Sequence, residues 1–142
     1  MGKRFSFWMY TTVVLQLFTA VFHSLSFIIK EEPANDTERQ LHELLTTYHK
    51  DLGAGFHPTM MNLFISLSAC FALLYLFGGL TNGFLMKKKA GSHILKGILN
   101  ISLIVFGICF ALMVGFTFLI PITCTGLVFI ALVAARLTLP KV

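Results

Sequence analysis

Five polar residues recur on one face of the first apolar segment and are the clearest candidates for chemistry in this chain. They follow one another at spacings of four, three, four and three residues: Thr12, Gln16, Thr19, His23 and Ser26. Because an unsatisfied polar group in lipid is costly, we expect this polar seam to face the interior of a helix bundle. Hydrogen bonds between helices would explain it, each stabilising by about 0.6 to 2 kcal/mol. The functional alternatives are a polar pathway for a solute or proton, a cofactor contact at Gln16 and His23, and docking against another membrane subunit.

The residue types that bind metals or perform catalysis do not combine into a recognisable site. Six candidate ligands lie toward the outer side: His23, His42, His49, His57, Met60 and Met61. Such ligands would suit copper or haem, but His23 lies about 9 Å inside its helix while His57 lies at a loop edge. The three cysteines form no C-x-x-C pair, and no Asp or Glu falls within an apolar segment. We therefore expect no metal, no cofactor and no enzymatic activity. A redox protein that binds haem, metal or quinone remains an alternative.

The composition identifies an integral membrane protein. Of 142 residues, 56% are hydrophobic and 12% are charged, and residues 52–86 and 97–135 contain no Asp, Glu, Lys or Arg. The mean hydropathy is +0.82. A water-soluble fold cannot bury that much apolar surface. The net charge of +5 does not indicate nucleic-acid binding, because the basic residues flank apolar segments and do not form one exposed stripe.

The lengths of the apolar segments predict an all-α bundle of four transmembrane helices in a single domain, residues 1–142. A hydrocarbon core about 30 Å thick needs about 20 helical residues. The predicted spans are 5–29, 59–86, 97–120 and 121–137, with an external loop at 30–58 and a cytoplasmic loop at 87–96. The uncharged stretch 97–135 is too long for one helix. Pro121 divides it and should open the fourth helix, where its missing N–H costs nothing.

The charge distribution predicts the orientation. Eight basic residues flank the spans on one side: Lys3, Arg4, Lys87, Lys88, Lys89, Lys96, Arg136 and Lys141. The loop 30–58 holds three basic residues (Lys30, Arg39, Lys50) and all six acidic ones, which are Glu31, Glu32, Asp36, Glu38, Glu43 and Asp51. Because cytoplasmic flanks retain basic residues, both termini should be cytoplasmic and this loop external. The apolar run 5–29 exceeds the core of a usual signal peptide, so we expect it to remain as a span.

The external loop should contain a short amphipathic helix of about four turns. Asn35 followed by Glu38 resembles a capping box, and an apolar stripe follows at helical spacing, formed by Leu41, Leu44, Leu45 and Tyr48. Gly53 or Gly55 can end the helix. We expect the helix to lie across the mouth of the bundle or along the bilayer interface. It would either cap the bundle or dock a partner.

Small residues at four-residue spacing predict close helix packing in the second and third spans. These residues are Gly79 and Gly83 in the second span, and Gly107, Ala111 and Gly115 in the third. Such faces serve contacts inside the bundle or an interface with a neighbour. Asn82 and Asn100 are expected to fasten the cytoplasmic ends of these two spans together. The fifteen phenylalanines are too many for one small core, so many should face lipid or a partner.

The arrangement resembles an uncharacterised bacterial family of small four-helix integral membrane proteins. The resemblance is carried by Glu38-Arg39-Gln40-Leu41, by Tyr48-His49-Lys50-Asp51-Leu52 and by Gly78-Gly79-Leu80-Thr81-Asn82. In size and span layout the chain is also loosely similar to DoxX-like proteins. The resemblance implies a bacterial inner membrane protein and supplies no chemistry.

Together these observations favour a non-enzymatic accessory or assembly subunit that binds within a larger membrane complex. Its partners would be membrane lipids and either other membrane subunits or further copies of itself. The main alternative is a small solute or proton-linked carrier or channel that uses the polar seam.

Overall fold

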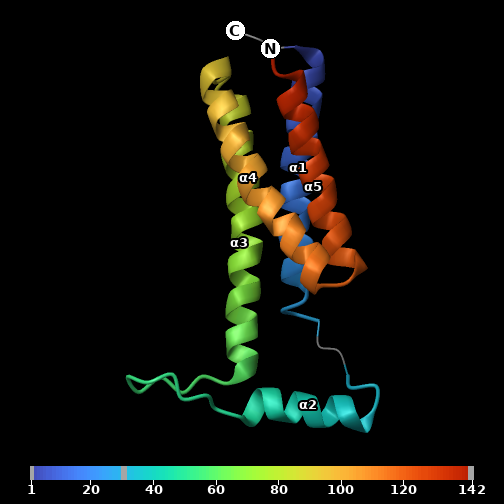
Figure 1. Cartoon of the computed structure of the whole chain (residues 1–142), viewed down its shortest axis with the longest axis vertical. Helices are drawn as coiled ribbons and strands as arrows, with labels where there is room; N and C mark the ends of the chain where they lie inside the picture. The colour runs from blue at the N-terminus through green and yellow to red at the C-terminus, as the bar shows by residue number, and fades with distance from the viewer. Residues whose placement is uncertain (1, 30–31, 141–142) are drawn as a thin grey trace. The chain divides into compact units, whose positions relative to one another are not determined.

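The structure, a computed structural model, describes residues 2–29 and 32–140, and the elements it forms there are all helices (Figure 1). These are α1 (Lys3–Leu25), α2 (Asp36–Thr47), α3 (Met60–Lys87), α4 (Ser92–Phe116) and α5 (Leu119–Thr138). Four of them, α1, α3, α4 and α5, are long and apolar enough to cross a membrane. The prediction of an all-α chain with four long apolar helices is therefore confirmed. Lys30, Glu31 and Lys141, which the orientation argument uses, lie outside the described residues.

The ends of the first and third long helices differ from the predicted spans. The first was expected at 5–29, but α1 ends at Leu25 and residues 26–28 form a turn. The Ser26 hydroxyl donates a hydrogen bond to the His23 carbonyl at 2.7 Å, which takes an acceptor that a continuing helix would use. The third span was expected at 97–120, but α4 covers Ser92–Phe116. Lys96 is tolerated in its second turn because a long basic side chain can extend to the helix end.

The turn between α4 and α5 precedes the proline that was expected to make it. Thr117 and Phe118 have extended backbones, and α5 starts at Leu119. Pro121 is thus the third residue of α5 and does not open it. The first amides of a helix have no partner within the helix, so proline is tolerated anywhere in this turn. At the end of α4, the Thr117 hydroxyl donates to the Met113 carbonyl at 2.8 Å.

The chain divides into two compact units. The first comprises residues 2–20 and 74–140, and the second comprises residues 21–73. Helices α1 and α3 each pass from one unit into the other, whereas α4 and α5 belong wholly to the first unit and α2 to the second.

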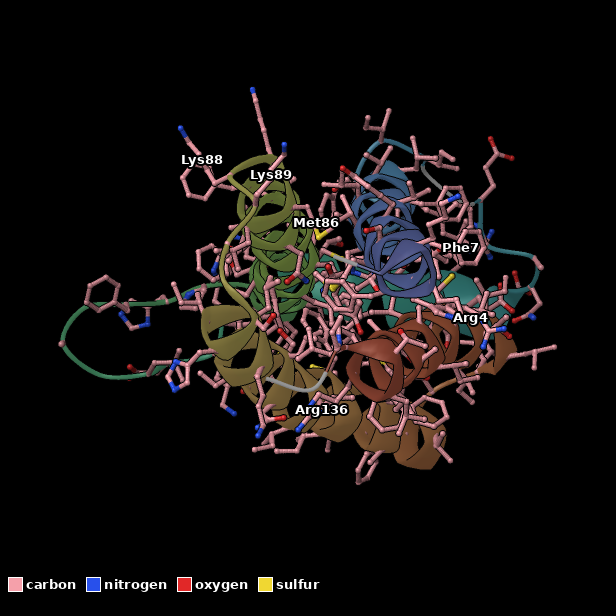
Figure 2. All side chains as sticks on the ribbon, turned by 90° about the horizontal axis from the view of Figure 1, so that it is seen from above. Arg4, Phe7, Met86, Lys88, Lys89 and Arg136 are labelled. Atoms are coloured by element: carbon pink, nitrogen blue, oxygen red, sulfur yellow. The ribbon has the colours of Figure 1, made fainter. Side chains whose placement is uncertain are left out.

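In the first unit, the basic ends of the four long helices come together. Seen from that end, Arg4 of α1, Lys88 and Lys89 after α3 and Arg136 of α5 surround the bundle (Figure 2). The core of this unit comes from all four helices and includes Phe5, Met9, Tyr75, Leu95, Leu99, Val128 and Leu132. The antiparallel order of the helices therefore gathers basic residues that are far apart in sequence.

Two glycines allow α4 and α5 to approach closely. A Cβ added at Gly107 would lie 3.0 Å from the Phe129 ring, and one added at Gly126 would lie 3.0 Å from the Phe110 ring. The two rings stack with centroids 5.9 Å apart. Each glycine thus makes room for an aromatic ring of the opposite helix.

In the second unit, α2 begins with reciprocal capping hydrogen bonds. The Asn35 side chain accepts from the Glu38 amide at 2.9 Å, and the Glu38 carboxylate accepts from the Ala34 amide at 2.8 Å. The helix ends at Thr47, with Tyr48 as its C-cap, earlier than the glycines that were expected to end it. This shortens the expected helix to 12 residues.

The two glycines instead form the turn of a short loop that folds back on itself. Gly53 and Gly55 have φ angles of 77° and 80°. Across the loop the Lys50 amide donates to the Pro58 carbonyl at 3.0 Å, and the Leu52 amide donates to the Phe56 carbonyl at 3.1 Å. The positive φ angles are the physical reason for glycine at these positions.

Candidate functional site

The polar seam of α1 has different environments along its length. Thr12, Gln16 and Thr19 are buried, His23 is half-buried, and Ser26 is exposed beyond the end of the helix. The Thr12 hydroxyl donates to the Trp8 carbonyl at 2.9 Å. Thr12 and Ser26 both bond the backbone of their own segment. Thr12, Gln16 and Thr19 are the seam residues that belong to the first unit. Among them, Gln16 makes a side-chain hydrogen bond to another helix, α3.

That bond joins two buried amides. Asn82 Nδ2 of α3 donates to Gln16 Oε1 of α1 at 3.0 Å, and both side chains are fully buried. Asn82 therefore fastens α3 to α1, whereas the sequence led us to expect it to join the second and third spans. Asn100, the other residue expected in that role, accepts from Arg136 Nε of α5 at 2.7 Å.

Glycines on α3 provide the room for this amide pair. A Cβ added at Gly79 would lie 2.8 Å from Leu17 Cδ2, and one added at Gly78 would lie 2.7 Å from Gln16 Nε2. Gly83, one turn further on, would meet Val13 at an ordinary 3.6 Å. The predicted small-residue pair of the second span therefore faces α1, and Gly78 accommodates the glutamine amide.

One donor and one acceptor of the pair remain unused. Gln16 Nε2 and Asn82 Oδ1 are buried without a hydrogen-bond partner in the part of the chain that the structure describes. A buried polar atom left unpaired costs about 1 to 3 kcal/mol. An unpaired atom of this kind next to an open space marks a position where a ligand or water can bind.

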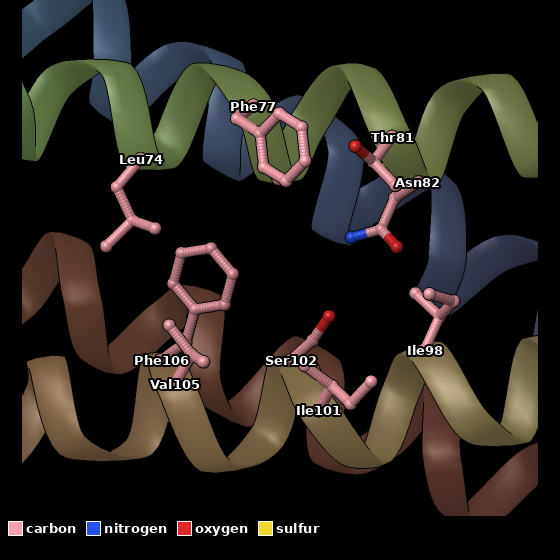
Figure 3. A pocket seen from close by; sticks show the side chains of 10 residues that line it. Leu74, Phe77, Thr81, Asn82, Ile98, Ile101, Ser102, Val105 and Phe106 are labelled. Atoms are coloured by element: carbon pink, nitrogen blue, oxygen red, sulfur yellow. The ribbon is translucent and has the colours of Figure 1, made fainter.

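Such a space adjoins Asn82. A cavity of about 140 Å³ lies between α3 and α4, and most of its lining residues are apolar. Figure 3 shows the Asn82 side chain projecting from α3 into this space, and the Ser102 hydroxyl projecting toward it from α4. Asn82 and Phe106 are buried on the inner side, while Phe77 and Ile101 are 70% and 60% exposed at the opening. The cavity therefore opens sideways, on the apolar surface of the bundle.

His23 belongs to the second unit. Its ring meets Phe71 edge-on at 4.9 Å between centroids and Phe27 at 6.0 Å. Its Nε2 atom is buried without a hydrogen-bond partner among the described residues. Gln16 and His23, the two candidate cofactor contacts, thus belong to different units.

The small-residue ladder of α4 is occupied only in part. Gly107 receives the Phe129 ring, but Ala111 and Gly115 are exposed, and nothing lies within 4 Å of a Cβ added at Gly115. One residue of the ladder is thus used against α5, and the other two are open in the first unit.

Within residues 2–29 and 32–140, His, Cys, Asp and Glu form no group of three or more that could hold a metal ion. Two histidines of the second unit, His49 and His57, make local contacts. His49 Nδ1 lies 2.6 Å from the His57 carbonyl, and His57 Nδ1 lies 3.8 Å from Asp51 Oδ1.

The sequence pointed to Gln16 but not to its surroundings. Gly78 and Asn82 are four residues apart and therefore lie on one face of α3. This spacing was the feature of the sequence that could have predicted a common contact of the two residues with Gln16. Ser102 and Phe106 show the same spacing on α4, but nothing local indicates that they face α3.

Comparisons with models of protein families, with curated proteins and with solved structures give no match for this chain. The resemblance to small bacterial four-helix proteins therefore stays a prediction.

Proposed function

We propose that this chain is a non-enzymatic integral membrane protein that acts by binding, as an accessory or assembly subunit of a larger membrane complex. The four long helices contain no Asp or Glu, because all six acids lie between residues 31 and 51. Acid–base chemistry inside the bundle would therefore have no carboxylate available. The proposal places the basic end of the first unit (Figure 2) in the cytoplasm, following the preference of basic residues for that side.

One observation carries the proposal, the apolar tip formed by residues 116–120. Phe116, Phe118 and Leu119 are 83%, 66% and 76% exposed. They lie within residues 97–135, which contain no Asp, Glu, Lys or Arg. The first amides of α5 receive no side-chain cap at Phe118. Irregular backbone with open hydrogen-bonding groups does not persist in contact with lipid, so it has to be covered by protein or lie at the membrane surface.

The tip adjoins the open part of the α4 ladder. Ala111 and Gly115 are exposed on the last turns before the tip, and Ile104 and Ile108 continue the same face. Small residues allow another helix backbone to approach closely, and large side chains beside them provide packing area. A transmembrane helix of another subunit lying on this face would cover both the glycine and the tip.

Photo-cross-linking in native membranes tests the proposal. A photoreactive phenylalanine analogue at Phe116 should give a defined adduct with another membrane polypeptide. The same analogue at Phe7, which is 63% exposed on α1, provides a control of the same residue type. Gly115→Leu should remove the adduct by filling the open face, whereas Gly97→Leu, at the other open glycine of α4, should preserve it.

Mass spectrometry of the products decides between the possible occupants. Adducts from Phe116 to lipid only, to a second copy or to residues 60–73 of the same chain would contradict an accessory subunit. Equal adducts from Phe7 and Phe116 would show that the tip is not a specific contact.

A further inference from the structure

The cavity between α3 and α4 is lined mostly by apolar residues, and one of its polar lining residues, Asn82, carries an unpaired acceptor. Asn82 Oδ1 is buried and has no hydrogen-bond partner among the described residues, and the Asn82 side chain projects into the cavity (Figure 3). The Asn82 amide nitrogen is already used, because it donates to Gln16. A ligand must therefore supply a hydrogen-bond donor to the oxygen.

Ser102 narrows the chemistry of the ligand. Its hydroxyl projects into the same space from α4 and can donate or accept a hydrogen bond (Figure 3). A ligand hydroxyl can donate to Asn82 Oδ1 and at the same time accept from Ser102. The lining residues carry no charge, so a charged head group would lose its hydration without gaining a counter-ion.

The size and walls of the cavity favour a ring. An engineered cavity of about 150 Å³ with apolar walls binds benzene, and this cavity has a similar volume of about 140 Å³. Phe106 and Phe77 contribute aromatic surfaces, and Ile98 and Val105 complete an apolar wall. An aromatic ring can pack edge-on or offset against such phenylalanines.

The position along the helix suits a molecule that dissolves in the membrane. Asn82 lies five residues before Lys87, where α3 ends, which corresponds to about 8 Å below the basic end of the helix. The opening between Phe77 and Ile101 faces sideways on the apolar surface, so entry from the bilayer does not require the bundle to unfold.

We propose that this cavity binds a membrane-dissolved phenol, meaning an uncharged aromatic ring with a hydroxyl group, which donates its hydrogen bond to Asn82 Oδ1. The hydroxyl satisfies the acceptor that the Gln16–Asn82 pair leaves open, and the ring fills the apolar volume. This site does not depend on the proposed partner surface of α4, which lies on other residues.

The test uses the full chain in nanodiscs and two probes followed by fluorine NMR. 4-Fluorophenol carries the hydroxyl donor, and 4-fluoroanisole replaces that hydrogen by a methyl group. Empty nanodiscs correct for partition into lipid. We expect saturable binding of 4-fluorophenol and about tenfold weaker binding of 4-fluoroanisole, because each 1.4 kcal/mol changes affinity tenfold and an unpaired buried acceptor costs about that much.

Two pocket variants and a matched control locate the binding. Ser102→Phe should abolish binding by filling the cavity. Ile130→Phe, at a position on α5 that is 61% exposed and outside the cavity, should bind like the unmodified chain. Asn82→Leu should reduce the affinity for 4-fluorophenol to that for 4-fluoroanisole. Because Asn82→Leu also removes the partner of Gln16 and can impair folding, Ser102→Phe remains the decisive variant.

Three results would overturn the proposal. Equal affinity for the two probes would show that no hydrogen bond to Asn82 selects the ligand. Equal binding by Ser102→Phe and Ile130→Phe would place the probe elsewhere. The absence of saturable binding would show that water or a lipid chain fills the cavity.

Discussion

Alanine at Gly78 tests how tightly the three helices meet around the buried amide. A Cβ at this position would lie 2.7 Å from Gln16 Nε2 of α1 and 2.7 Å from Phe106 Cζ of α4. Favourable contacts between heavy atoms lie at about 3.5 to 4.0 Å, so the methyl group is close to 1 Å too near on both sides. Both atoms are ends of side chains, so Gln16 and Phe106 have to shift, and the shift of Gln16 strains its hydrogen bond to Asn82.

Gly83→Ala provides the comparison. Its Cβ would meet Val13 Cγ1 at 3.6 Å, which is ordinary contact. Both variants gain about the same helix propensity, roughly 1 kcal/mol, and this gain cancels when the two are compared. The difference between them is then the cost of overpacking, about 1 to 3 kcal/mol. We expect Gly83→Ala to stabilise the fold and Gly78→Ala to be less stable than Gly83→Ala by that amount.

The free energy of unfolding can be measured in mixed micelles by titration with sodium dodecyl sulfate. Far-ultraviolet circular dichroism follows the loss of helix, and fluorescence of Trp8, the single tryptophan, follows α1. Gly115→Ala, where nothing lies within 4 Å, should behave like Gly83→Ala. If Gly78→Ala is as stable as these two variants, the close approach of α1, α3 and α4 at Gly78 is wrong.

Three further predictions follow from the same contacts. Gln16→Leu and Asn82→Leu should each destabilise by about 1 to 3 kcal/mol in the same titration, and the double variant should lose less than the sum; strict additivity would mean that the 3.0 Å bond contributes nothing. Asn35→Ala should weaken the start of α2 by about 1 kcal/mol, seen as faster amide hydrogen exchange across the helix, and unchanged exchange would contradict the cap. With the native cysteines replaced, Lys88→Cys should react with an impermeant maleimide only after lysis and Asp51→Cys in intact cells; the reverse pattern would contradict the proposed orientation.

The candidate site could be predicted only in part from the sequence. Gln16 stood out because a polar side chain in an apolar helix needs a partner, and this holds whatever the fold. Its partner did not stand out, because Asn82 is 66 residues away and its position near the basic end suggested a contact between α3 and α4. The rotation of α3 about its axis decides which helix Asn82 meets, and the spacing of Gly78, Gly79 and Asn82 along α3 does not show whether that face meets α1 or α4.

The sequence by itself determined the number of long apolar helices and the capping of α2. Hydropathy over about 20 residues and the Asn35–Glu38 spacing are local properties, so they hold in any arrangement of the helices. The helix ends were harder to predict from the sequence. Pro121 is tolerated within the first turn of α5, and the break between the helices falls at Thr117 and Phe118.

Only the tertiary structure decided beside which small residues another side chain packs and beside which the space stays open. Gly107 and Gly115 belong to one ladder in the sequence, yet Phe129 fills the space beside Gly107 and nothing approaches Gly115. It also decided that Asn82, whose Oδ1 atom is buried without a partner among the described residues, lines a cavity of about 140 Å³. The physical reason is that the local sequence of a helix does not show which neighbour covers each of its faces. Those neighbours come from elsewhere in the chain.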